Sequence, residues 1–129
     1  MKQVLLVEPD TILAKTIASY LMNRGLAVST ATTAQAAIAS ADATLPDVVI
    51  LELAMPNHNG IEFLQEFRSY SDWTNIPIIV YSHIPQEDTG LSAAEWHKYG
   101  AVDYLYKPTI GLERLAAILQ NSAVSAVEA

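Results

Sequence analysis

Short apolar runs alternate along this chain with segments in which apolar residues recur every three or four positions. The apolar runs, most of them rich in branched or aromatic residues, lie at residues 3–7, 27–30, 48–51, 76–81 and 102–106, and such runs favour β-strands. The periodic segments favour amphipathic helices and lie at residues 11–24, 33–41, 61–69, 92–99 and 112–120. Strands that alternate with helices in this way predict right-handed βαβ units and a parallel sheet covered on both faces.

The residues beside the first helix support its boundaries. Asp10 is a good N-cap for it, and Gly25 is a good stop signal after it. We expect one stripe of this helix to face the core, formed by Leu13, Ile17, Tyr20, Leu21 and Arg24. Between the fourth strand and the fourth helix, residues 83–90 carry turn formers and two acids, so we expect a loop there.

The run over residues 48–51 is bounded on both sides by turn-forming residues, which is typical of a strand buried on both faces. Glu52 follows this run directly. Open α/β sheets bind their ligands in the crevice beyond the carboxyl ends of the strands. The sequence therefore predicts that Glu52 lies in such a crevice.

Composition narrows the possible functions. The 129 residues suit one domain, which we expect over residues 1–121, with a short flexible tail over residues 122–129. Fourteen acidic and seven basic residues give a net charge of −7 without a cluster of Lys or Arg, which argues against nucleic-acid binding. The chain has no cysteine, so disulfides and thiolate metal sites are excluded. No apolar run could span a bilayer, and there is no signal-peptide pattern, so we expect a cytoplasmic protein without membrane contact.

Four separated motifs carry a family resemblance: VLLVEPD, LPDVVILELAMPNHNG, PIIVYS and GAVDYLYKP. Their order and spacing resemble the receiver domain of two-component response regulators over nearly the whole chain. The resemblance implies a flavodoxin-like, doubly wound sheet of five parallel strands in the order 2-1-3-4-5, with five helices. It also implies phosphorelay signalling through a protein partner, such as a histidine kinase or another signalling protein, and no enzyme activity.

The resemblance assigns roles to residues at the strand ends. The family binds magnesium with an acidic pair after the first strand, and here Glu8 matches the first member while Pro9 replaces the second. Glu52 stands where the family has the aspartate that accepts a phosphoryl group. Since proline offers no side-chain oxygen, we expect magnesium to bind weakly or not at all, and no other cofactor is implied.

Further matches follow on the last two strands. The resemblance implies that Ser82 and Lys107 are the hydroxyl and the lysine that contact phosphoryl oxygens, and that Tyr104 is the aromatic residue that moves with the switch. It also implies a cis peptide bond between Lys107 and Pro108.

The two departures from the family pattern favour a pseudo-receiver, which works without phosphorylation. Phosphoryl transfer depends on positioning and on neutralisation by the metal. The extra methylene of Glu52 moves its oxygens by roughly 1.3 Å, and a misplacement of about 1 Å can slow a reaction on the order of a hundredfold. The longer carboxylate could instead reach Lys107 and Ser82 and hold the domain in one state.

The residues at the strand ends also allow roles other than that of a pseudo-receiver site. Glu52 and Lys107 could form a purely structural salt bridge. Asp10 could be a remnant of the acidic site that completes a working phosphoacceptor site, although a helix cap is the simpler role. A small-molecule site in the crevice is a weaker alternative, because no glycine-rich phosphate loop follows the first strand. His58, His83 and His97 lack partners at metal-ligand spacing.

The aromatic residues near the fifth strand indicate a partner face. Trp96, Tyr99 and Tyr106 lie with Tyr104 in one region of the sequence, and aromatic residues are enriched at binding hot spots. Core packing is the alternative for Trp96 and Tyr99. Family members commonly dimerise or dock partners through the face formed by the fourth helix, fifth strand and fifth helix, so a homodimer there is also open. The loop over residues 83–90 looks longer than the family's usual connection, and it could reshape that face.

Overall fold

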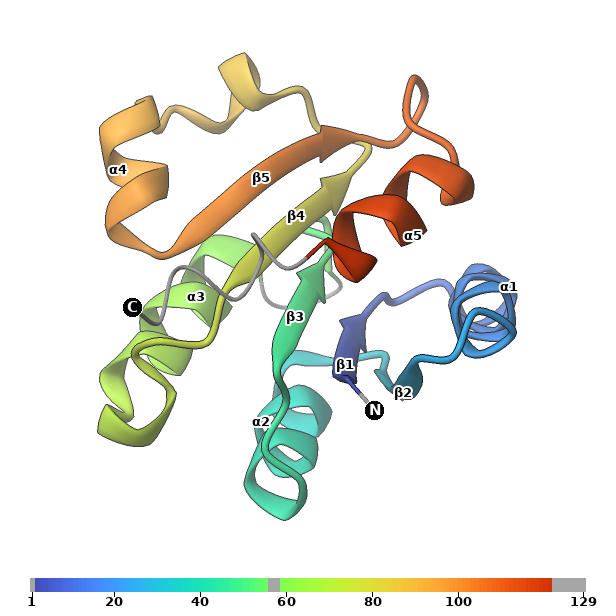
Figure 1. Ribbon diagram of the computed structural model, residues 1–129. Coiled ribbons are helices and arrows are strands. Elements are labelled where there is room, and N and C mark those ends of the chain that lie inside the picture. The colour runs from blue at the N-terminus through green and yellow to red at the C-terminus, as the bar shows by residue number, and fades with distance from the viewer. Residues whose placement is uncertain (1, 56–58, 122–129) are drawn as a thin grey trace.

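Five parallel strands form one sheet at the centre of the molecule in the computed structural model, which describes residues 2–55 and 59–121 (Figure 1). The strands are β1 (Gln3–Val7), β2 (Ala27–Ala31), β3 (Val48–Leu51), β4 (Ile78–Ser82) and β5 (Ala101–Tyr106). Their order in the sheet is β2-β1-β3-β4-β5, which confirms the predicted doubly wound, flavodoxin-like topology. The prediction of a flexible tail over residues 122–129 concerns residues outside the described part of the chain.

The helices lie in two layers, one on each face of the sheet (Figure 1). They are α1 (Thr11–Met22), α2 (Ala34–Ala43), α3 (Gly60–Ser69), α4 (Ala93–Lys98) and α5 (Leu112–Gln120). One core cluster joins residues of α2, α3 and α4 to one face of the sheet, and the other cluster joins α1 and α5 to the opposite face. Two short 3-10 helices, η1 (Ser71–Trp73) and η2 (Gln86–Thr89), were not predicted. None of the helices in the described ranges is long and apolar enough to cross a membrane.

The position of β3 in the sheet explains why its sequence is continuously apolar. Val49 and Leu51 point into the cluster under α2 and α3, whereas Val48 and Ile50 point into the cluster under α1 and α5. Successive side chains of a strand point to opposite faces, and here helices cover both faces, so every residue of β3 is buried. This central position places Glu52, the next residue, at the middle of the carboxyl edge of the sheet.

The C-terminal end of α1 differs from the prediction. The helix ends at Met22, and Gly25 supplies the positive φ of the turn that follows. Arg24 is exposed rather than part of the core stripe, and its guanidinium lies 3.6 Å from the centre of the Tyr20 ring. Burial of this cation would need a charged partner, so it stays at the surface over an aromatic face.

Close packing also shapes the segment after β3. The Gly60 N–H donates to the Leu53 carbonyl at 2.8 Å. A Cβ atom at Gly60 would lie 2.6 Å from the Leu53 Cα, so only glycine fits at the start of α3. This contact holds the backbone just beyond Glu52 against the first turn of the helix.

Candidate functional site

Four polar side chains follow the ends of four adjacent strands at the carboxyl edge of the sheet. Glu8 comes after β1, Glu52 after β3, Ser82 at the end of β4 and Lys107 after β5. Backbone hydrogen bonds continue the sheet to these residues, from Glu52 N to Val7 O at 3.0 Å and from Lys107 N to Ser82 O at 2.8 Å. The topology therefore brings together four residues that lie far apart in the sequence.

These four side chains are almost completely buried. Glu8 and Glu52 are each 3% exposed, Ser82 is 0% exposed, and the Lys107 side chain is 6% exposed. Burial of charged groups costs free energy unless they are paired and hydrogen-bonded. Their partners therefore decide what this site can do.

Donors surround both oxygens of the Glu52 carboxylate. Ser82 Oγ donates to Oε2, and Ala54 N donates to the same oxygen at 3.2 Å. Lys107 Nζ donates to Oε1 at 2.9 Å, and His83 N donates to it at 3.1 Å. The imidazole of His83 is also close, with Nδ1 3.2 Å from Oε1. Both oxygens of the Glu52 carboxylate thus already accept hydrogen bonds from the protein itself.

This environment keeps Glu52 ionised. Burial by itself raises the pKa of Glu52, but the hydrogen bonds from Ser82 and Lys107 and the charge of Lys107 outweigh it and bring the pKa from 4.5 to about 2. Near neutral pH the site therefore holds a permanent negative charge between the ends of β3 and β4.

Lys107 bridges the two buried carboxylates. Its ammonium donates to Glu8 Oε1 as well as to Glu52 Oε1. The second oxygen of Glu8 accepts a hydrogen bond from Asp10 N at 3.1 Å. The protein itself thus places one positive charge between the Glu8 and Glu52 carboxylates.

The donor set does not fit a magnesium ion. Each of Glu8 and Glu52 gives an oxygen to Lys107, and Pro9 offers none. The exposed Asp10 acts as the N-cap of α1, since its Oδ1 accepts from Ile12 N at 3.1 Å and Leu13 N at 3.0 Å. Across residues 2–55 and 59–121, no three His, Cys, Asp or Glu side chains are grouped so that they could hold a metal ion.

A chain of contacts leads from this site towards α4. Ile84 N donates to Ser82 Oγ at 3.0 Å, and the Tyr104 hydroxyl donates to Ile84 O. The Tyr104 ring packs edge-to-face on Trp96, with ring centres 5.4 Å apart. Burial, together with the charge of Glu52, raises the pKa of Tyr104 to about 12, so its hydroxyl stays a donor.

The predicted partner face needs a correction. Trp96 is 3% exposed, and its indole Nε1 donates to Thr89 Oγ1 at 3.3 Å. The core alternative therefore holds for Trp96, which belongs to the core cluster under α2 and α3. Tyr99 and Tyr106 are partly exposed. A hollow of about 300 Å³ lies between residues of η2, α4 and β5 and is lined by Gln86, Ala93, Trp96, His97, Ala101, Val102, Asp103 and Tyr104.

Other predictions for this region have mixed outcomes. The bond between Lys107 and Pro108 is trans, so the cis prediction was wrong; trans is the commoner isomer before proline. His83 contacts the site, whereas His97 lies exposed on α4 and His58 lies outside the described residues. The contribution of Ala54 was missed, because a backbone donor leaves no signal in the sequence.

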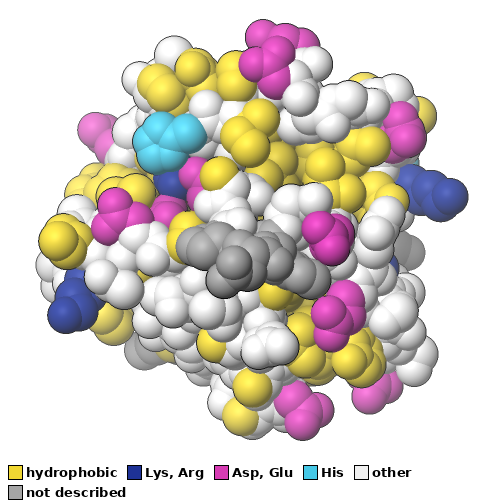
Figure 2. Space-filling view, turned by 180° about the vertical axis from the view of Figure 1, so that it is seen from behind, with side chains coloured by type: hydrophobic (Ala, Val, Ile, Leu, Met, Phe, Trp, Pro, Cys, Tyr) yellow, Lys and Arg dark blue, Asp and Glu magenta, His cyan; other side chains and the backbone are white. Residues whose placement is uncertain are grey.

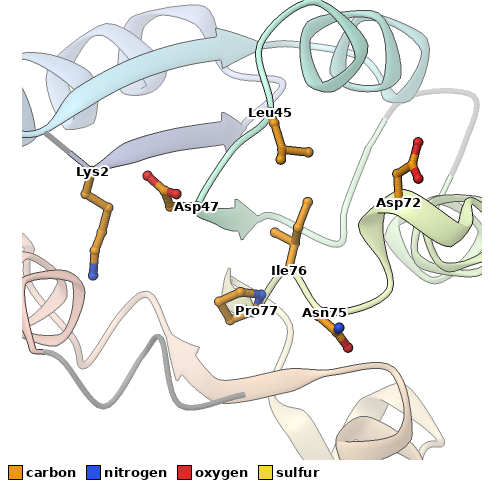
Figure 3. Close-up of a pocket in the computed structure, with 7 residues that line it drawn as sticks. All are labelled: Lys2, Leu45, Asp47, Asp72, Asn75, Ile76 and Pro77. Carbon is orange, nitrogen blue, oxygen red and sulfur yellow. The ribbon is translucent and has the colours of Figure 1, made fainter. Parts of the chain in front are cut away.

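A second hollow, of about 220 Å³, lies at the opposite, amino end of the strands (Figure 3). It is lined by Lys2, Leu45, Asp47, Asp72, Asn75, Ile76 and Pro77. Lys2 Nζ donates to Leu119 O at 2.7 Å, and Asp47 Oδ2 accepts from Gln3 N at 2.7 Å. These charged groups bind backbone atoms rather than one another, so the hollow has no arrangement comparable to the carboxyl end.

The surface matches the acidic composition. On the face that Figure 2 shows, Asp and Glu side chains are scattered, and the fewer Lys and Arg side chains do not gather into a patch. This view gives no support to a phosphate-backbone interface.

Comparison with known proteins gives a consistent result. Residues 4–120 match a family model described as "Response regulator receiver domain". The KDP operon transcriptional regulatory protein KdpE of Escherichia coli is 34% identical over 120 residues, which cover 93% of this chain and 50% of that protein. A protein-glutamate methylesterase/protein-glutamine glutaminase 2 of Cereibacter sphaeroides is 35% identical over 122 residues, which cover 92% of this chain and 32% of that protein. The chain therefore spans half or less of these two relatives.

Solved structures agree with this result. Chemotaxis protein CheY4 of Vibrio cholerae superposes with a TM-score of 0.82 at 28% identity, covering 93% of this chain and 97% of that one. A sensor protein from Polaromonas sp. JS666 gives a TM-score of 0.85 at 19% identity, covering 98% of each chain. The second likeness concerns the fold alone.

Proposed function

The chain belongs to the response regulator receiver domain family, and on that basis we propose that it is a pseudo-receiver that signals through protein contacts without accepting a phosphoryl group. The observation that carries this proposal is the engagement of Glu52. Ser82 and Lys107, the groups that the family turns towards phosphoryl oxygens, donate to the Glu52 carboxylate instead.

The chemistry of phosphoryl transfer supports the proposal. The attacking oxygen must reach phosphorus in line, and a metal ion must offset the charge on the transferring group. Here Glu52 would have to leave Ser82, Lys107, Ala54 and His83 before it could attack. With Pro9 in place of an acid, the protein also lacks one carboxylate for the metal.

The same contacts suggest how the domain could signal. An ionised Glu52 gives Ser82 and Lys107 a permanent acceptor, so the site does not need a donor molecule to fill it. Ser82 Oγ accepts from Ile84 N, and the Ile84 carbonyl in turn binds Tyr104 next to α4. We expect these contacts to hold the face of α4, β5 and α5 in one arrangement, on which a protein partner docks. That partner would be a histidine kinase or another signalling protein.

Intact mass spectrometry tests the proposal. The protein is incubated with magnesium and acetyl phosphate, beside a Pro9→Asp/Glu52→Asp double variant that restores both acids. We expect the parent to keep its mass and the double variant to gain one phosphoryl group. The two single variants show which departure is the larger obstacle. A parent that gains a phosphoryl group on Glu52 would contradict the proposal, and peptide mapping would identify the residue.

The alternative of a purely structural ion pair predicts a different result in a binding experiment. If Glu52 holds the partner face, Glu52→Gln should weaken partner binding even when the variant remains folded. Glu62→Gln is the matched control, because Glu62 is an exposed residue of the first turn of α3. Equal binding by the parent and both variants would leave Glu52 with a structural role only.

A further inference from the structure

The two edges of the sheet differ in how they are protected. An edge strand presents unpaired N–H and C=O groups that can pair with another chain, and proteins usually block them with charges, bulges or covering segments. Strands β2 and β5 are the edges here. Only β5 carries such features within the part of the chain that the structure describes.

The outer edge of strand β5 is blocked by the strand's own residues and by the loop that follows it. Its register against β4 skips Val102, since Ile78 pairs with Ala101 and Ile79 pairs with Asp103, and such a bulge disturbs an edge. The Asp103 carboxylate accepts the N–H of Tyr104 at 3.0 Å. The following loop also returns to this strand, since Thr109 N donates to Tyr106 O at 3.0 Å.

Strand β2 has none of these features. Ala27 N donates to Lys2 O at 3.0 Å and Ala31 O accepts from Glu8 N at 2.9 Å, so these two residues face β1. Because backbone direction alternates along a strand, Ser29 also faces β1, while Val28 and Thr30 direct their N–H and C=O groups outward. Among the described residues, β2 pairs with β1 alone.

The charge pattern favours a second copy of this chain as the occupant of that edge. No charged residue occurs between Arg24 and Asp42, which is the longest uncharged stretch of a chain with net charge −7. Two copies that met through most other surfaces would bring like charges together. Strand β2 itself, residues 27–31, carries no charge, so pairing along it brings no like charges of the two strands together.

We propose that β2 is a self-association strand, which pairs antiparallel with β2 of a second copy and joins two sheets across a two-fold axis. With Val28 and Thr30 outward, Val28 of one copy lies opposite Thr30 of the other, and each of these two pairs exchanges two backbone hydrogen bonds. Ser29 then meets its own counterpart on the axis. The same residues of β2 thus contribute from both copies under the two-fold rotation, as an isologous dimer requires.

The dimer should be weak. Strand β2 has five residues, and such a ribbon buries less than the roughly 1,000 Å² of a stable interface. We therefore expect reversible association that appears as the protein concentration rises. This inference does not depend on the state of Glu52, so it can fail while the proposed function holds.

Sedimentation velocity of the full chain, from low micromolar to millimolar concentration, tests the proposal. We expect the sedimentation coefficient of the parent to rise towards that of a dimer. Thr30→Lys places a charge at the edge without altering the backbone, and Thr30→Pro removes the outward N–H without removing a bond to β1. Each should lower the association constant by about tenfold or more, because like charges meet or two of four backbone bonds are lost.

A matched control separates the edge from a general effect of charge. Ser19→Lys adds the same charge to the exposed side of α1, and it should associate as the parent does. Circular dichroism checks that Thr30→Pro is folded. If Thr30→Pro is unfolded, the association constant of Thr30→Lys tests the pairing alone. A parent that stays monomeric throughout would overturn the proposal. Undiminished association of Thr30→Lys would also overturn it and would point to another face.

Discussion

The two ends of the sheet treat charge in opposite ways. At the carboxyl end, Glu8, Glu52 and Lys107 are buried and bind one another. At the amino end, the partly buried Lys2 and the exposed Asp47 each bind a single backbone atom. The arrangement at the carboxyl end has a high desolvation free energy, because several charges leave water together. The arrangement at the amino end costs little.

This difference favours the carboxyl end of the sheet as the functional end. A fold that needed only stability could fill the carboxyl end with apolar side chains, since such replacements are often neutral or stabilising. The charges at that end instead surround the position where the family accepts a phosphoryl group.

Removal of the ammonium should have the largest effect. Lys107→Met leaves Glu8 and Glu52 buried beside each other without a counter-charge, which should lower the free energy of unfolding by about 3–5 kcal/mol. Urea denaturation measures this loss. Lys98→Met is the control, since Lys98 is exposed at the end of α4 and should change stability by less than about 0.5 kcal/mol. Equal effects of the two substitutions would show that Lys107 does not stabilise the buried carboxylates of Glu8 and Glu52.

The carboxyl end should also dominate the loss of stability in acid. The pKa of Glu52 is about 2 in the folded protein and 4.5 in an ordinary environment. The unfolded chain therefore takes up this proton first, so the contribution is complete above pH 4.5 and is lost as the pH falls towards 2. The gap in unfolding free energy between the parent and Glu52→Gln should shrink by about 3 kcal/mol over this range. A gap that stays constant with pH would mean that Glu52 is not specially stabilised.

Loss of the hydroxyl should have an intermediate effect. Ser82→Ala removes a donor to Glu52 Oε2 and the acceptor for Ile84 N, both in a buried setting. We expect a loss of about 1–3 kcal/mol in unfolding free energy. Ser19→Ala, at an exposed position of α1, should cost nothing. A Ser82→Ala variant as stable as the parent would show that this hydroxyl is dispensable.

The amino end should be the least sensitive. Asp47→Ala removes one exposed hydrogen bond to Gln3 N, which should cost no more than about 1 kcal/mol. Thermal or urea unfolding gives the value. A loss as large as that of Lys107→Met would remove the contrast between the two ends of the sheet.

The fold and the positions of the main site residues could be predicted from sequence for a simple reason. The apolar run over residues 48–51 and the turn residues around it predict a buried strand that ends at Glu52, and the family resemblance implies the strand order that aligns the other strand ends with it. Glu8, Glu52, Ser82 and Lys107 all meet there. Their roles in signalling stay predictions.

The remaining features depend on geometry that residue types do not reveal. The N–H of Ala54 is a donor to Glu52 only because of the backbone direction after β3. Trp96 lies in the core, and Thr89 of the 3-10 helix η2 accepts its N–H, whereas the sequence showed only a loop with turn formers at residues 83–90. The strand order implied by the family resemblance already made β2 an edge strand, but only the structure shows that, among the described residues, β2 pairs with β1 alone.

Carbon-13 NMR of the side-chain carboxyl groups reports whether Ser82 and Lys107 bind the Glu52 carboxylate in solution. In protein labelled at glutamate, Glu52→Gln identifies the Glu52 resonance by its disappearance. We predict that this resonance keeps the shift of an ionised carboxylate down to about pH 3 and titrates near 2. A titration centred near the ordinary value of 4.5 would show the contrary, that Ser82 and Lys107 do not hold the Glu52 carboxylate.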